Sequence, residues 1–253
     1  YADVACHMDS ATSTSSPFIS TSFSLFWSVW EALRRYHFGM KRDISIAVID
    51  ARTVREHAVT ALQLLRSACP GERHTDYWKW YKYAQEAQLV LVYGHISKAS
   101  VLSSIPLLTV VRALPSYFLR CDPTSDIKLS DLAWDYTDRK FSYHQLCRAM
   151  SGRFVKLTPN EMLGDATAAA VRLSMTLLRP WMYTIVTKDP VSARDAACAL
   201  AFNIAQWPGK WWAREHGEVW MILQAMVATL IDELAVEQLR AQAETSRLEK
   251  IVH

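Results

Sequence analysis

Three hydroxyl side chains follow one another at the end of a predicted strand, in the segment Ser20-Thr21-Ser22. A hydroxyl in this place can act as a nucleophile, bind a substrate or cap the helix that follows. Ser20 is the preferred nucleophile because it follows Phe18-Ile19 directly at the sheet edge. Ser22 is assigned to substrate binding or to a cap, and Ser24 to the cap of the next helix. Serine is a weak nucleophile without a neighbouring base, and the sequence does not identify that base.

A carboxylate and two phenols lie on a predicted helix just before the apolar segment Leu89–Tyr93. We expect Glu86 to serve as a general acid or base, and Tyr83, three positions earlier, shares a helix face with it. Tyr81 is assigned to substrate binding. The structural alternative makes Glu86 an exposed residue of an amphipathic helix.

Asp50 ends a second predicted strand, Ile44–Ile49, where it could hold a cationic substrate or orient a hydroxyl. The alternative that we favour is a cap of the helix that begins near Thr53. Ser20 and Asp50 end predicted strands, and Glu86 precedes one. We therefore expect these three side chains to converge in one pocket.

Two groups of cationic residues could bind phosphates. The first lies between a predicted helix and the next strand and consists of Arg34, Arg35, Lys41 and Arg42. These side chains could bind tRNA, or they could complement the dipole at a solvated helix end. The second group interleaves cations with aromatic rings and consists of Trp207, Lys210, Trp211, Trp212, Arg214 and His216. Such a pattern is typical of single-stranded nucleic-acid binding, whereas burial in the core would give these tryptophans a structural role.

The composition is that of a folded globular protein, with 51% hydrophobic and 21% charged residues among 253. The net charge of +3 excludes a strongly basic nucleic-acid binder but permits a local basic patch. No apolar run reaches the roughly 20 residues that a membrane-spanning helix needs, so we expect no membrane association. The five cysteines are widely spaced and odd in number, which favours free thiols in a reducing cytoplasm.

Several cofactor and enzyme signatures are absent from the sequence. The seven glycines form neither G-x-G-x-x-G nor a Walker loop, which argues against dinucleotide and P-loop sites. No Cys/His cluster, H-E-x-x-H or G-x-S-x-G motif occurs. We therefore predict no metal and no cofactor.

The order of elements favours an α/β fold with a Rossmann-like, mainly parallel sheet in the first half. Strands are expected over 18–20, 44–49 and 89–93, with helices over 25–36, 54–68 and 77–87. The second half reads as helical, with segments near 129–136, 141–150, 160–179, 190–205 and 214–248. We place the division after residue 121, giving an α/β catalytic-type half over 1–121 and a helical half over 122–253 packed on it.

The segment Phe18–Ser22, the Trp-bearing helix, Ile44–Asp50 and Leu89–Gly94 together resemble a large set of fungal proteins of unknown function, over roughly residues 4–115. One further resemblance is to the ADP-ribosyltransferase fold. Its active members carry an Arg on an early strand, a Ser-Thr-Ser strand and a Glu just before a Val-Leu strand. Here the Glu position falls on Leu89, and no Arg precedes residue 34. This resemblance implies a degenerate fold that acts as a non-catalytic interaction protein.

The resemblance that we prefer is to the tRNA-dependent cyclodipeptide synthases, in particular the fungal arginine-using group. That class is similar to the catalytic domain of an aminoacyl-tRNA synthetase. The resemblance implies that Ser20 holds the aminoacyl group and that Tyr83 and Glu86 assist on a helix. It also implies a basic patch, here the arginines 34, 35 and 42, for aminoacyl-tRNA as the partner. The implied product is an arginine-containing cyclic dipeptide of secondary metabolism.

Overall fold

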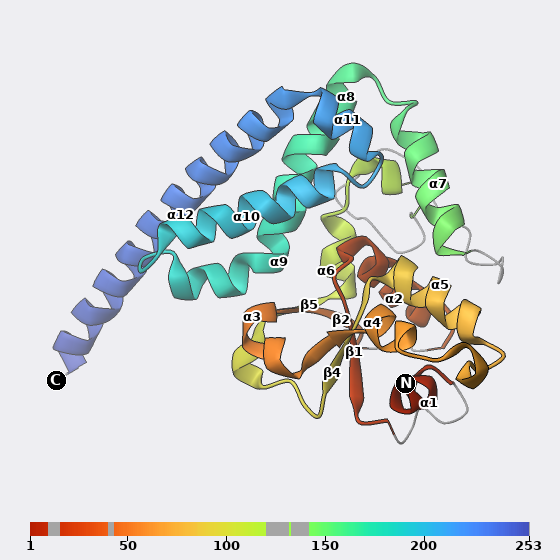
Figure 1. The fold of residues 1–253 in the computed structure, drawn as a ribbon. Coiled ribbons are helices and arrows are strands. Elements are labelled where there is room, and N and C mark those ends of the chain that lie inside the picture. Colours follow the sequence, from red (N-terminus) through yellow and green to blue (C-terminus); the bar gives the residue numbers. More distant parts are fainter. Residues whose placement is uncertain (10–15, 40–42, 120–131, 133–141, 253) are drawn as a thin grey trace. The chain divides into compact units, whose positions relative to one another are not determined.

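The computed structural model divides the chain into two compact units, Tyr1–Leu102 and Ser103–His253 (Figure 1). It describes residues 1–9, 16–39, 43–119, 132 and 142–252. The division falls earlier than the boundary that we predict after residue 121.

A three-stranded antiparallel sheet forms the centre of the first unit. β4 (Leu89–Tyr93) is the central strand and pairs with β1 (Phe18–Ser22) on one side and β3 (Ala58–Thr60) on the other. Ser20 lies opposite Leu91 in the register of β1 and β4. The first four residues of β4 are buried, which explains why this strand is a continuous apolar run.

The predicted Rossmann-like parallel sheet is wrong, because the strands of both small sheets are antiparallel. The second sheet pairs β2 (Ser45–Ile49) with β5 (Val101–Pro106). β2 alternates between exposed and buried positions at its start, so it is not covered on both faces as a parallel core strand would be. Apolar runs indicate which residues are buried, but they carry little information about the direction in which two strands pair.

The helices of the first unit are α1 (Ala2–Met8), α2 (Leu25–His37), α3 (Ala51–Val54), α4 (Ala61–Arg66) and α5 (Tyr77–Ala87). The single helix predicted over 54–68 is wrong, because β3 interrupts it. Val59 and Thr60 are β-branched and pair with β4, and the Thr60 side chain then caps α4 by accepting from the Gln63 amide. Gln88 has a φ of 46°, which lets the chain leave α5 and enter β4 directly.

The second unit is helical from Leu107 onwards in the part that the structure describes. Its helices are α6 (Leu107–Arg112), α7 (Tyr143–Phe154), α8 (Pro159–Gly164), α9 (Ala170–Ile185), α10 (Pro190–Ala205), α11 (Lys210–Glu215) and α12 (Gly217–Val252), with a π-helical segment over Asp165–Ala169. The helical segments expected near 141–150, 160–179, 190–205 and 214–248 are present. The one expected near 129–136 lies outside the described residues, except for Leu132.

α12 packs on α10 through one apolar stripe, in which Val219, Leu223, Val227, Ile231 and Leu234 are buried. Beyond Leu234 most of its side chains are exposed. By length and composition α12 could also cross a membrane, and it is the one described helix with that property. A core helix of a soluble protein can have the same length and composition.

Candidate functional site

The side chain of His7 lies between two serine hydroxyls. Its Nε2 is 2.8 Å from Ser20 Oγ, and its Nδ1 is 2.6 Å from Ser16 Oγ. With the proton on Nδ1, the imidazole donates to Ser16 and leaves the Nε2 lone pair to accept the Ser20 proton. This arrangement pairs a nucleophile with a base, and it holds the base through a third group.

Local structure explains how these three side chains meet. His7 lies in the last turn of α1, and Ser20 lies in the middle of β1. Ser16 Oγ also accepts a hydrogen bond of 3.1 Å from the Phe18 amide, which fixes the segment that leads into β1. The Phe18 ring packs edge-on against His7 at a centroid distance of 5.9 Å, and against Tyr93 of the neighbouring strand at the same distance.

The imidazole is held in its basic form. Partial burial lowers the pKa of His7 below its ordinary value of 6.5. The lowered pKa favours the neutral imidazole that a general base needs, while Ser20 is exposed and open to a substrate.

Glu86 and Asp50 do not join this cluster. Glu86 forms an ion pair of 3.8 Å with Lys82, one turn earlier on α5. Asp50 caps α3 by accepting from the Arg52 amide at 3.0 Å, and it pairs with the Arg52 guanidinium at 2.9 Å, which lowers the pKa of its carboxyl. Among the described residues, no hydrogen bond or ion pair links Ser20 to either carboxylate, so these contacts do not unite the three residues that we expected in one pocket. The capping alternative for Asp50 is confirmed.

Ser22 has a structural role in the hydrogen-bond network. Its hydroxyl lies 2.5 Å from the Ala87 carbonyl oxygen at the end of α5, and it accepts from the Ser24 amide at 2.9 Å. Ser24 in turn caps α2 by accepting from the Trp27 amide at 3.1 Å. These bonds engage the Ser22 hydroxyl both as a donor and as an acceptor, and its role in substrate binding stays a prediction.

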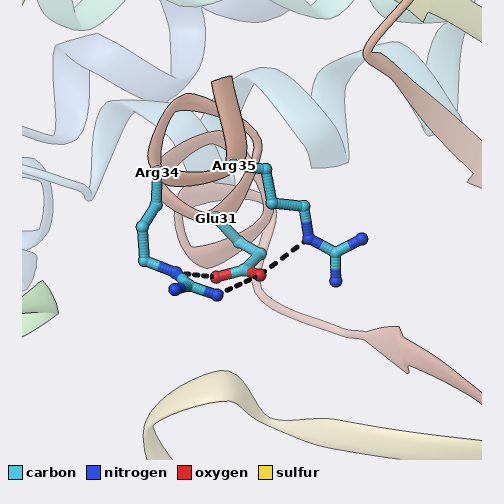
Figure 2. A network of polar contacts seen from close by, with 3 residues as sticks. All are labelled: Glu31, Arg34 and Arg35. Carbon is cyan, nitrogen blue, oxygen red and sulfur yellow. Dashed lines mark hydrogen bonds and ion pairs between the residues drawn. The ribbon is translucent and has the colours of Figure 1, made fainter. Parts of the chain in front are cut away.

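Arg34 and Arg35 form a second cluster around Glu31 on α2 (Figure 2). Glu31 accepts from Arg34 Nε at 2.7 Å and from Arg35 Nε at 2.8 Å. Burial of Glu31 opposes its ionisation, but the hydrogen bonds from both arginines outweigh this and lower its pKa. Burial, and then the charge of Glu31, raise the pKa of Tyr83, which also packs edge-on against Trp27 at 5.3 Å. Both arginines thus form ion pairs with Glu31, which offsets part of their positive charge. Their role in tRNA binding stays a prediction.

The remaining candidate residues lie outside both clusters or outside the described residues. Tyr81 accepts from Arg66 Nη2 at 2.9 Å, whereas Lys41 and Arg42 lie outside the described residues. In the second unit, Trp212 is buried and stacks on His216 at 4.3 Å, while Trp211 is exposed. The core role is therefore confirmed for Trp212.

The described residues contain no group of three or more His, Cys, Asp or Glu side chains that could hold a metal ion. Cys69 and Cys198 are free thiols, as their spacing predicts, and Cys121 lies outside the described residues.

Sequence reasoning missed His7 and Ser16. The only signal available was a histidine upstream of the serine-rich segment, and its distance along the chain gave no reason to connect it with Ser20. The contact depends on how α1 returns to the sheet, which is a tertiary effect.

Comparison with known proteins gives a match to a family of unknown function. Residues 1–110 match the family model described as a domain of unknown function, DUF7587. This span contains the complete first unit, including Ser20 and His7, and agrees with the predicted resemblance to proteins of unknown function. No curated protein and no solved structure matches the chain. The matched family therefore supports neither the cyclodipeptide synthase nor the ADP-ribosyltransferase resemblance.

Proposed function

We propose that the first unit transfers acyl groups through Ser20, with His7 as the general base. The observation that carries this proposal is the contact of 2.8 Å between Ser20 Oγ and His7 Nε2, with Ser16 on the other ring nitrogen. The lowered pKa of His7 supports it, because only the neutral imidazole can accept a proton.

The proposed reaction begins with attack of Ser20 Oγ on the carbonyl carbon of an ester, while the hydroxyl proton passes to His7 Nε2. The tetrahedral intermediate then breaks the bond to the leaving alcohol, and His7 returns the proton to that alcohol. An amine or water attacks the resulting acyl-serine in the same way. Ser20 and the neutral imidazole are regenerated, and all protons are accounted for.

The donor class is an activated ester. An aminoacyl-tRNA is such an ester, so the predicted formation of an arginine-containing cyclic dipeptide is one specific form of this reaction. The antiparallel sheet removes the fold argument for an aminoacyl-tRNA synthetase-like domain. The cyclic dipeptide therefore stays a prediction from resemblance, whereas acyl transfer rests on the geometry of His7 and Ser20.

A burst assay with p-nitrophenyl acetate tests the proposal on the full chain. We expect one equivalent of p-nitrophenol per active chain, followed by slower turnover, as an acyl-serine accumulates. Ser20→Ala should abolish the burst, and His7→Gln should slow it by about a hundredfold or more. His57→Gln, which alters an exposed histidine elsewhere in the same unit, is the matched control and should leave the burst unchanged. A burst that survives Ser20→Ala would refute the assignment.

The pairing of β1 with β4 favours a second candidate, a non-catalytic interaction protein with a degenerate ADP-ribosyltransferase-like fold. The pairing places the Ser-Thr-Ser strand beside β4, which corresponds to the strand that follows the family's Glu. Ser22 lies opposite Leu89, the residue at the Glu position. Because Leu89 is apolar, the chain would lack the carboxylate that active members of that family carry at this position for their reaction with NAD. Binding of NAD without its hydrolysis, together with no burst, would favour this candidate over acyl transfer.

A further inference from the structure

Two arginines and three aromatic rings form a continuous cluster on α4, α5 and the segment between them. The Arg73 guanidinium lies 4.5 Å from the Tyr77 ring centroid and 5.7 Å from that of Trp78. The Arg66 guanidinium lies 5.8 Å from the Tyr81 ring centroid, and Arg66 Nη2 donates to the Tyr81 hydroxyl at 2.9 Å. The Tyr81 ring is 6.1 Å from Tyr77 and 5.8 Å from Trp78, so it joins the two halves of the cluster.

The two arginines are not neutralised by carboxylates. Within the part of the chain that the structure describes, neither Arg66 nor Arg73 forms an ion pair, and the Nε atom of Arg73 has no hydrogen-bond partner. The nearby lysines differ, because Lys79 pairs with Asp76 at 3.9 Å and Lys82 pairs with Glu86 at 3.8 Å. Aromatic rings hold the two guanidinium groups in place while their charges stay available to an anion.

The cluster also presents an exposed ring. Trp78 is 67% exposed, which is unusual for the largest apolar side chain. An indole that is 67% exposed lies 5.7 Å from the Arg73 guanidinium, and the Tyr81 ring connects it to Arg66. Such a surface can stack a base and contact the phosphates on either side of it.

We propose that the surface formed by Arg66, Arg73, Tyr77, Trp78 and Tyr81 binds single-stranded nucleic acid. Trp78 stacks on a base, and the two arginines contact backbone phosphates. Tyr77 is buried and positions Arg73, and Tyr81 positions Arg66. Recognition of this kind tolerates any base sequence, because every base offers a stacking face. The inference goes beyond acyl transfer and does not depend on it.

Fluorescence anisotropy with a fluorescein-labelled 12-nucleotide uridine RNA tests this surface on the full chain. We expect salt-dependent binding, and Arg66→Gln or Arg73→Gln should each reduce the slope of log affinity against log salt by about 0.7. Trp78→Ala should weaken binding by about 5- to 100-fold. Because Trp78 is so exposed, this variant should fold normally, and a thermal melt checks that it does.

Matched controls come from the same chain. Arg52→Gln alters an exposed arginine that is already paired with Asp50, and Trp211→Ala alters a tryptophan that is 53% exposed in the second unit. Both should bind the RNA like the wild type. Ser20→Ala should also bind normally, so failure of acyl transfer and failure of RNA binding can be told apart.

Three results would overturn the proposal. The first is the absence of RNA binding at low salt. The second is loss of binding in Trp211→Ala with retention in Trp78→Ala, which would move the site to the second unit. The third is equal binding of the RNA by the wild type and by Trp78→Ala, with full competition by heparin, which would identify a general polyanion surface without base stacking.

Discussion

In the proposed reaction, His7 is the adjacent base that a serine hydroxyl needs to become an effective nucleophile. In the part of the chain that the structure describes, no hydrogen bond links the Ser20 hydroxyl to a carboxylate, and Glu86 and Asp50 pair with Lys82 and Arg52. The imidazole is at 2.8 Å, has a lowered pKa and is held by Ser16. The proposed site therefore consists of the His7 imidazole and the two serine side chains within hydrogen-bond distance of it, Ser16 and Ser20.

The rate of Ser20 acylation should depend on pH through His7 alone between pH 5 and 8. The pKa of His7 lies below 6.5, so the rate should be constant above pH 6.5 and should fall as the pH drops through the lowered pKa. The burst rate with p-nitrophenyl acetate measures this profile. A rate that continues to rise between pH 7 and 8 would show that another group is the base.

Ser16 is a positioning residue, because it contacts the imidazole and not the substrate. Ser16→Ala removes the acceptor for Nδ1 and frees the ring to rotate, so the acylation rate should fall about 10- to 100-fold. Ser16→Thr retains the hydroxyl and should recover most of the rate. Equal rates in the wild type and Ser16→Ala would mean that the contact has no catalytic role.

The sequence predicts most individual elements of the first unit but not their arrangement. β1, β2, β4, α2 and α5 all match predicted segments, because apolar periodicity and caps are local signals. β3 was missed because its three residues lie within a helix-like pattern. The antiparallel pairing was missed because β1 and β4 are distant in sequence, and nothing local fixes the direction in which they meet.

The same limit applies to the candidate site. Ser20 could be selected from the serine-rich end of a predicted strand, although it lies in the middle of β1, and Asp50 could be recognised as a cap. The partnership of Ser20 with His7 could not be predicted, because it depends on the packing of α1 beside β1. The ion pairs of Arg34 and Arg35 with Glu31 follow from their spacing of three and four residues on one helix. The prediction of a basic patch considered only the positive charges and did not take Glu31 into account.

The cap of α2 should contribute measurably to stability. Ser24→Ala removes the acceptor for the Trp27 amide and should lower the free energy of unfolding by about 1 kcal/mol. Urea denaturation followed by circular dichroism measures this loss. Ser24→Asp keeps an acceptor at the cap and should restore the stability. If Ser24→Ala unfolds at the wild-type midpoint, the amide is satisfied by water and the cap is dispensable.

For the molecule as a whole, acid should destabilise the fold in two separate pH ranges. The folded state lowers the pKa of His7, so its contribution is complete above pH 6.5 and is lost as the pH falls through the lowered value. The folded state also lowers the pKa of Glu31, whose contribution is complete above pH 4.5 and is lost below that.

Urea midpoints measured from pH 8 to pH 3 separate these two ranges. His7→Gln should remove the loss that begins below pH 6.5 and leave the loss below pH 4.5 intact, whereas Glu31→Gln should reduce the second. Unchanged midpoints of the wild type between pH 7 and pH 5 would contradict the environment assigned to His7.

The central claim is that His7 activates Ser20, and covalent labelling with a fluorophosphonate probe tests it most directly. The probe phosphonylates an activated serine with loss of fluoride, and tandem mass spectrometry identifies the modified residue. We predict that the label is on Ser20 in the wild type and in His57→Gln, and that His7→Gln labels at least a hundredfold more slowly. Labelling of Ser20 at the same rate in His7→Gln, or no label on Ser20 in the folded protein, would contradict the account.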